Sequence, residues 1–98
     1  MEELIYEFNA EKKLEKSAHV GVVGSGNLEV IIEPRKDDKV IVNVRTGISG
    51  FKRTWDELIE RFFKEHNYAS NVYINDFGAT PGVVKIRLYQ AIEVTNDV

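Results

Sequence analysis

The chain has 98 residues, of which 43% are hydrophobic, and it carries a formal net charge of −3. This length suits a single domain covering residues 1–98, because two separate cores would each be too small to be stable. The absence of cysteine excludes disulfides, thiolate metal sites and a cysteine nucleophile. The acidic balance argues against nonspecific nucleic-acid binding. The apolar runs are too short to span a bilayer and no signal pattern is present, so we expect a cytoplasmic protein with no nucleic-acid or membrane partner.

The N-terminal half of the chain shows β-structure patterns. Residues 4–8 are a candidate edge strand. Residues 18–23 and 28–33 are rich in small and β-branched side chains, and a glycine-containing turn separates them. Residues 40–45 place alternate valines on one face. These spacings predict a three-stranded antiparallel meander with tight turns.

An amphipathic helix is predicted next. Thr54 stands three residues before Glu57, which is the spacing of a capping box at a helix start. Apolar side chains then recur at helical spacing and form one stripe, composed of Trp55, Leu58, Ile59, Phe62, Phe63 and His66. This stripe needs an apolar sheet face to cover it.

The remaining segments predict one more strand and one more helix. Residues 71–76 alternate as a fourth strand does, whereas residues 83–94 fit both strand alternation and helical spacing. A hydroxyl at Thr80 followed by Pro81 is typical of a helix start, so we predict a helix there. The expected fold is α+β: a small antiparallel β-sheet, made of the meander and a fourth strand, with two helices packed on one face.

Catalytic constellations are missing from the sequence. His19 and His66 lie in no metal-binding or nucleophile motif, and His66 belongs to the apolar helix stripe, which favours packing. Asp76 and the pair at 37–38 lack the spacing of a metal site and suit turns. We therefore expect neither a metal nor an enzyme acting with its own residues.

The segment Gly24-Ser25-Gly26 permits two interpretations. It is neither a Walker loop nor a dinucleotide fingerprint, and by itself it is a hairpin turn. Flanking glycines would also leave the Ser25 hydroxyl accessible to a transferase with a bulky phosphate donor. No neighbouring base activates this hydroxyl, so Ser25 would accept a group instead of acting as a catalyst.

The segment Phe77-Gly78-Ala79-Thr80-Pro81-Gly82 is the second notable stretch. As a connection between a strand and a helix, it uses glycine for an unusual φ and proline for helix entry. The alternative is a partner-docking surface that includes Phe77 and Pro81. The pattern alone leaves both interpretations open.

Both segments resemble one known family. Residues 21–30, Gly-Val-Val-Gly-Ser-Gly-Asn-Leu-Glu-Val, resemble the segment around the modified serine of the malonate decarboxylase acyl carrier proteins, the delta subunits. Residues 76–83, followed by Lys85-Ile86-Arg87, resemble the C-terminal signature of that family. The tryptophan-bearing helix between them also fits, so the resemblance covers nearly the whole chain. Many relatives have aspartate where this chain has Asn27, and both residues suit a turn.

The resemblance implies a carrier function at Ser25. This serine would hold 2′-(5″-phosphoribosyl)-3′-dephospho-coenzyme A through a phosphodiester, and the thiol of that arm would carry acetyl and malonyl groups as thioesters. The implied partners are an acetyl/malonyl transferase subunit, the decarboxylase subunits and the transferase that forms the holo-carrier. The citrate lyase gamma subunit is a more distant relative that lacks the Phe-Gly-Ala-Thr-Pro stretch. The alternatives are a small non-catalytic α+β binding or regulatory module, from pattern alone, and the carrier subunit of a citrate-lyase-like complex.

Overall fold

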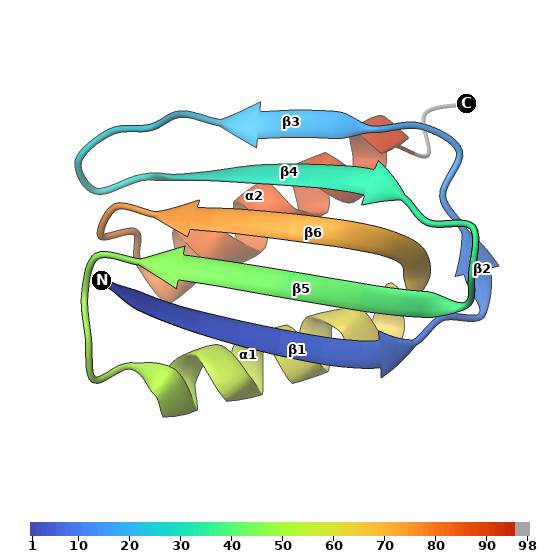
Figure 1. Cartoon of the computed structure of the whole chain (residues 1–98). Coiled ribbons are helices and arrows are strands. Elements are labelled where there is room, and N and C mark those ends of the chain that lie inside the picture. Colours follow the sequence, from blue (N-terminus) through green and yellow to red (C-terminus); the bar gives the residue numbers. More distant parts are fainter. Residues whose placement is uncertain (96–98) are drawn as a thin grey trace.

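The computed structural model describes residues 1–95, which form six strands and two helices (Figure 1). In chain order the elements are β1 (Glu2–Asn9), β2 (Lys12–Lys13), β3 (Ala18–Gly21), β4 (Leu28–Pro34), β5 (Lys39–Thr46), α1 (Lys52–Glu65), β6 (Tyr68–Asp76) and α2 (Pro81–Thr95). The predicted α+β class is confirmed, and the molecule is not a four-helix bundle. Neither helix in residues 1–95 combines the length and apolar character needed to cross a membrane.

The sheet is mixed, with strand order β1-β5-β6-β4-β3 and the short β2 paired separately with β6. The predicted edge strand and the β3–β4 hairpin are both present. The third strand of the predicted meander is wrong, because β5 pairs with β1 and in parallel with β6, while β6 lies between β5 and β4. The reason is α1: a helix between two strands gives the long crossover that parallel pairing requires.

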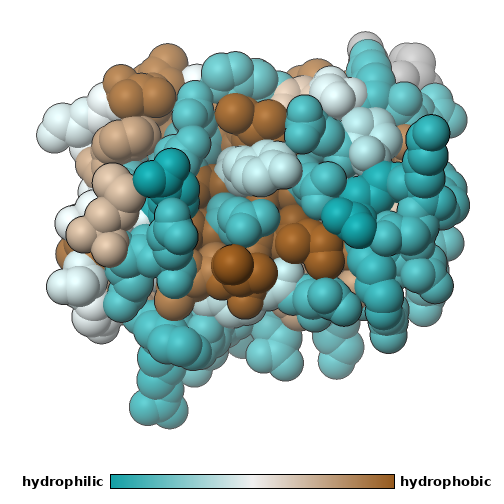
Figure 2. Space-filling view, in the orientation of Figure 1, coloured by the Kyte–Doolittle hydropathy of each residue, from teal (hydrophilic) through white to brown (hydrophobic). Residues whose placement is uncertain are grey.

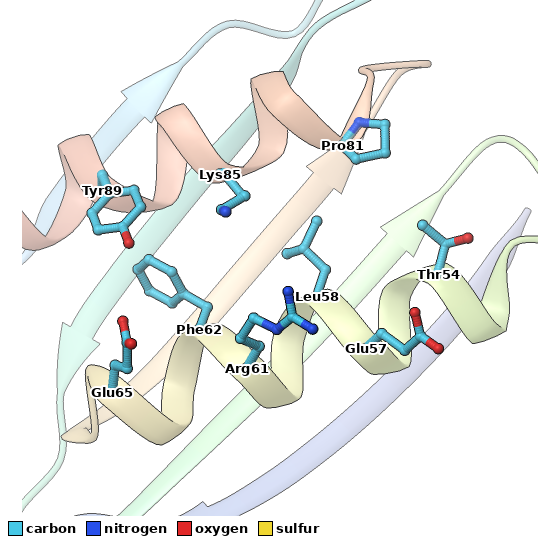
Figure 3. A pocket seen from close by; sticks show the side chains of 9 residues that line it. All are labelled: Thr54, Glu57, Leu58, Arg61, Phe62, Glu65, Pro81, Lys85 and Tyr89. Atoms are coloured by element: carbon cyan, nitrogen blue, oxygen red, sulfur yellow. The ribbon is translucent and has the colours of Figure 1, made fainter.

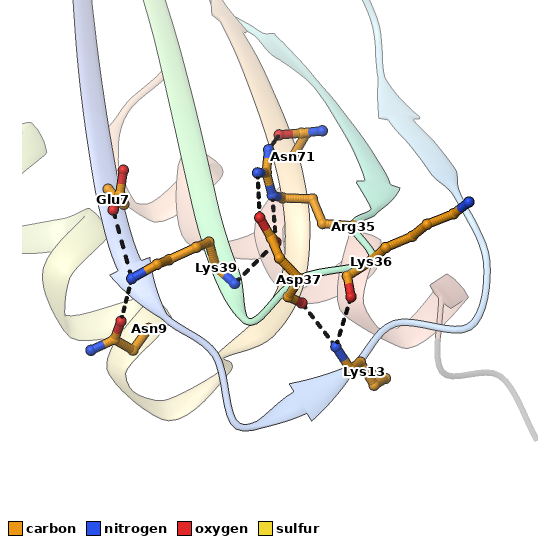
Figure 4. A network of polar contacts seen from close by, with 8 residues as sticks. All are labelled: Glu7, Asn9, Lys13, Arg35, Lys36, Asp37, Lys39 and Asn71. Carbon is orange, nitrogen blue, oxygen red and sulfur yellow. Dashed lines mark hydrogen bonds and ion pairs between the residues drawn. The ribbon is translucent and has the colours of Figure 1, made fainter.

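The connection from β4 to β5 therefore passes across the beginning of β6 (Figure 4). Arg35 holds this connection in place. Its backbone N–H donates to the carbonyl of Ala69, and its guanidinium donates to Oδ1 of Asn71 at 2.7 Å. The same guanidinium forms two bonds with Asp37, at 2.9 and 2.7 Å, and so holds the pKa of Asp37 down at about 2. This charged turn between β4 and β5 thus links β4 to β6.

Both helices cover one face of the sheet, α1 behind β1 and β5 and α2 behind β4 and β3 (Figure 1). The core between these layers is apolar, with fully buried strand residues Leu28, Val30, Val40, Val42, Val44, Val72 and Ile74 facing Ile59, Phe63 and Leu88 of the helices. The predicted stripe on the first helix is confirmed by the burial of Trp55, Ile59, Phe62 and Phe63. His66 also packs as expected, against the rings of Phe62 and Tyr89.

The predicted start of the first helix is wrong, whereas that of the second helix is confirmed. The Thr54–Glu57 capping box is wrong, because α1 begins at Lys52 and its N-cap, Phe51, makes no side-chain capping bond. An ion pair between Lys52 and Asp56 at 2.8 Å supports the extra residues at this start. The start of α2 is confirmed: the Thr80 carbonyl accepts from the Val84 N–H at 3.0 Å, and Pro81 is the first helical residue.

Within residues 1–95, no helix covers the opposite face of the sheet (Figure 1). Ile31, Ile41 and Tyr73 alternate along their strands with fully buried residues and therefore point to this face. Figure 2 shows this face with apolar side chains near its middle and hydrophilic ones around them.

Candidate functional site

Ser25 lies at the tip of the β3–β4 hairpin, at the end of the sheet where β5 and β6 also finish. The backbone N–H of Asn27 donates to the Gly24 carbonyl at 3.1 Å, so Ser25 and Gly26 are the central residues of a tight turn. Gly26 has φ +75°, the positive value that a type II turn requires at its second central residue. The Ser25 side chain is exposed, as the sequence predicted.

The surroundings of this turn are open. A Cβ added to Gly26 would meet no atom within 4 Å, and one added to Gly24 would meet only a methyl of Val22 at 3.9 Å. Within residues 1–95 the Ser25 hydroxyl makes no side-chain hydrogen bond, so no base is positioned to activate it. The residues present therefore fit a serine modified by an external enzyme, with room for a bulky group at the tip.

The second sequence motif braces the first. The N–H of Gly26 donates to the Phe77 carbonyl at 2.8 Å, and the N–H of Phe77 donates to the Asn27 carbonyl at 2.9 Å. Gly78, with φ +98°, lies against Gly26, since a Cβ on Gly78 would stand 3.9 Å from the Gly26 Cα. Two segments that are far apart in the sequence thus form one structural unit.

Asp76 holds this unit from beneath. The buried carboxylate accepts the Thr46 hydroxyl at 2.8 Å on one oxygen and the N–H groups of Gly78 and Ala79, at 3.2 and 2.9 Å, on the other. Asp76 therefore serves turn structure, as predicted. Thr46 was missed by sequence reasoning, because nothing in the sequence places the end of β5 beside the end of β6.

The other polar side chains of the hairpin form a separate cluster. Glu29 accepts from Asn75 at 2.7 Å and pairs with His19 at 2.8 Å. These hydrogen bonds, chiefly the one from Asn75, lower the pKa of Glu29. Among residues 1–95 no group of histidines and carboxylates is arranged to hold a metal ion.

The two residues predicted to contact partners lie in different places. Phe77 is 38% exposed and its backbone is bonded to the Ser25 turn. The exposed apolar residues Val22 and Val23 precede this turn in the chain, and Ile48 lies near Gly78. Pro81 is exposed at the start of α2 and lies on the rim of two cavities. One of these, about 350 Å³, is the groove between the helices (Figure 3). The other, about 310 Å³, lies beneath the Phe77–Ala79 segment.

Comparison with known proteins gives consistent results. The family model described as malonate decarboxylase delta subunit (MdcD) matches residues 15–95. A "malonate decarboxylase acyl carrier protein" of Stutzerimonas stutzeri (strain A1501) is 48% identical over 94 residues, which is 95% of each chain. A protein of the same name from Azotobacter vinelandii is 46% identical over 99 residues and 100% of each chain. In the crystal structure of a Pseudomonas malonate decarboxylase hetero-tetramer in complex with malonate, one chain matches with a TM-score of 0.91 and 43% identity, over 98% of this chain and 100% of that one.

Proposed function

Because the chain belongs to the malonate decarboxylase acyl carrier protein family, we propose that it carries acyl groups on a 2′-(5″-phosphoribosyl)-3′-dephospho-coenzyme A arm joined to Ser25 by a phosphodiester. When bound, the arm supplies a terminal thiol that holds acetyl and malonyl groups as thioesters. The carrier contributes no catalytic residue of its own. The observation that carries this proposal is the exposed Ser25 turn, whose shape is fixed by Phe77.

Attachment makes Ser25 the acceptor in a phosphoryl-type transfer. Its Oγ forms a bond to the α-phosphorus of a 5″-triphosphate donor, the bond from that phosphorus to the diphosphate breaks, and the hydroxyl proton passes to a base of the transferase. The contribution of this chain is to hold Oγ clear of other groups. The paired turn bonds to Phe77 limit how far the tip moves while the donor approaches.

The proposed partners are the transferase that loads Ser25, an acetyl/malonyl transferase subunit and the decarboxylase subunits. This proposal is supported by the structural match to a chain of a malonate decarboxylase hetero-tetramer. Exposed apolar residues beside Ser25 suit contacts with such partners, because a docking surface normally contains apolar groups that lose water on binding. A tethered substrate also reaches each partner at high effective concentration.

Intact mass spectrometry tests the proposal. The protein is produced together with the loading transferase and the arm donor, and the expected result is an added mass equal to that of the arm. Ser25→Ala should remain folded and gain no mass. The exposed serines Ser17 and Ser49 provide matched controls, since Ser17→Ala and Ser49→Ala should load as the wild type does. An adduct that persists in Ser25→Ala, or no adduct under conditions that load a related carrier, refutes the proposed site.

A further inference from the structure

A cavity of about 310 Å³ opens beside the Ser25 turn, between the starts of α1 and α2 and the ends of β5 and β6. Gly78 lines this cavity and also packs against Gly26, the residue that follows Ser25. Ile48 lines it as well, and its Cδ1 would stand 3.7 Å from a Cβ on Gly78. Anything attached to Ser25 therefore begins close to the mouth of this cavity.

The lining of the cavity suits a flat heteroaromatic ring. Its walls are apolar, with Trp55 and Leu58 inside and the half-exposed Phe51 and Ile48 near the opening. A few polar groups from Thr46, Thr54 and Asp76 lie among them. Such sites, mostly apolar with a small number of polar groups, bind rings that have apolar faces and polar edges.

We propose that this cavity holds the adenine of the arm. The inference rests on the proposed attachment at Ser25. Following the covalent order from the serine, the arm has a phosphate and two riboses before the adenine, whereas the thiol is at its far end. Adenine is thus the first aromatic group able to reach the cavity, and its binding there leaves the acyl-bearing end free to reach a partner.

The adjoining groove matches the next part of the arm. It shares the lining residues Thr54, Leu58 and Pro81 with the cavity, so the two lie side by side. Arg61 and Lys85 point into it from facing helices (Figure 3), and within the described residues neither forms an ion pair. Glu57 and Glu65 also line the groove. The diphosphate that follows the adenosine would bring its negative charge to the two free cations.

Holding the base would shorten the part of the arm that moves freely. A shorter free segment sweeps a smaller volume, so the thiol spends more time within reach of a docked subunit. The cavity is already formed, so little ordering of the protein opposes binding.

Emission from Trp55 tests this placement, because Trp55 is the single tryptophan of the chain and lines the cavity. Loading is first established by intact mass, and the ratio of loaded to unloaded emission is then measured for each variant. We expect the wild type to lose emission intensity on loading, through contact of the base with the indole. Phe51→Ala, which removes a wall, and Thr54→Phe, which fills the mouth, should load equally but lose this response.

A control is Tyr73→Ala, which removes another exposed aromatic side chain, this one on the face of the sheet away from the helices, and should retain the response. Full loading with unchanged Trp55 emission overturns the adenine placement and leaves the carrier proposal intact. An equal response in Phe51→Ala and Thr54→Phe also overturns it, because the effect then arises outside the cavity. Failure of the wild type to load removes both proposals.

Discussion

The hairpin that presents Ser25 contains three glycines, and replacing each by alanine should have a different effect on stability. Gly21 has φ +84°, and a Cβ there would stand 2.1 Å from the backbone carbonyl oxygen of Leu28. Leu28 is the first residue of β4 and its side chain is fully buried, so this oxygen cannot easily move away. Gly26 has φ +75° but open space, and Gly24 has neither a positive φ nor a close neighbour. The three positions therefore separate strain from steric overlap.

The expected magnitudes follow from these two effects. A left-handed φ costs a residue other than glycine about 1–2 kcal/mol, so Gly26→Ala should destabilise the fold by roughly that amount. Gly21→Ala adds a forced shift of β4, which typically costs about 1–3 kcal/mol more. The total, about 2–5 kcal/mol, would lower the Tm by on the order of 10–40 °C in a domain of this size. Gly24→Ala should lie within about 0.5 kcal/mol of the wild type.

Urea unfolding followed by far-UV circular dichroism measures all three variants on one scale. Gly24→Ala should be the most stable of the three variants, Gly26→Ala the next and Gly21→Ala the least stable. If the urea midpoint of Gly21→Ala equals that of the wild type, β3 does not approach the Leu28 carbonyl as closely as described. If Gly24→Ala is the most damaging, the turn geometry described above is wrong.

Three further changes probe other parts of the site. Thr46→Val leaves an oxygen of the buried Asp76 without its hydroxyl donor and should destabilise by about 1–3 kcal/mol in urea unfolding; an unchanged midpoint would show that the bond contributes nothing. Phe77→Ala should keep the fold, since its brace uses backbone atoms, but weaken co-purification with partner subunits; a large drop in Tm with normal assembly would make Phe77 a core residue. Burial lowers the pKa of His66, so its protonation favours the unfolded state, and stability should fall as pH drops below about 6.5. His66→Phe should lessen that fall in urea titrations at several pH values, and an identical pH profile in the variant would remove His66 as its source.

The elements themselves could be predicted because their signals are local. Alternation of Val40, Val42 and Val44 reflects one buried face, and Thr80-Pro81 marks a helix start. Which strands pair with each other could not be predicted in the same way, because strand pairing depends on segments that are distant in the sequence. Residues 35–38 form a short polar connection that suits a hairpin, and only the packing of α1 decides that β6 enters between β4 and β5. The capping box was wrong because α1 begins at Lys52, before Thr54, where an ion pair between Lys52 and Asp56 supports the first turn.

The candidate site likewise has one part that local sequence signals predict and another part that depends on the strand order. The exposed turn at Ser25 follows from glycine and hairpin chemistry, which the sequence displays. The brace from Phe77, the Asp76–Thr46 bond and the cavity at Trp55 all depend on strand order. Knowing that β5 and β6 are parallel neighbours would have placed Thr46 beside Asp76, because their register pairs these two residues.

The central place of β6 also bears on when the chain becomes competent for the proposed loading of Ser25. The β3–β4 hairpin is made from neighbouring segments and can form early, whereas β6 and the Phe77 segment follow α1 in the chain. Contacts between segments distant in the sequence form slowly, because the entropy of loop closure is lost before these contacts contribute any favourable free energy. The Ser25 turn acquires its Phe77 bonds only when the last strand has docked. A loading enzyme that recognises the braced turn would thereby distinguish finished carriers from chains still folding.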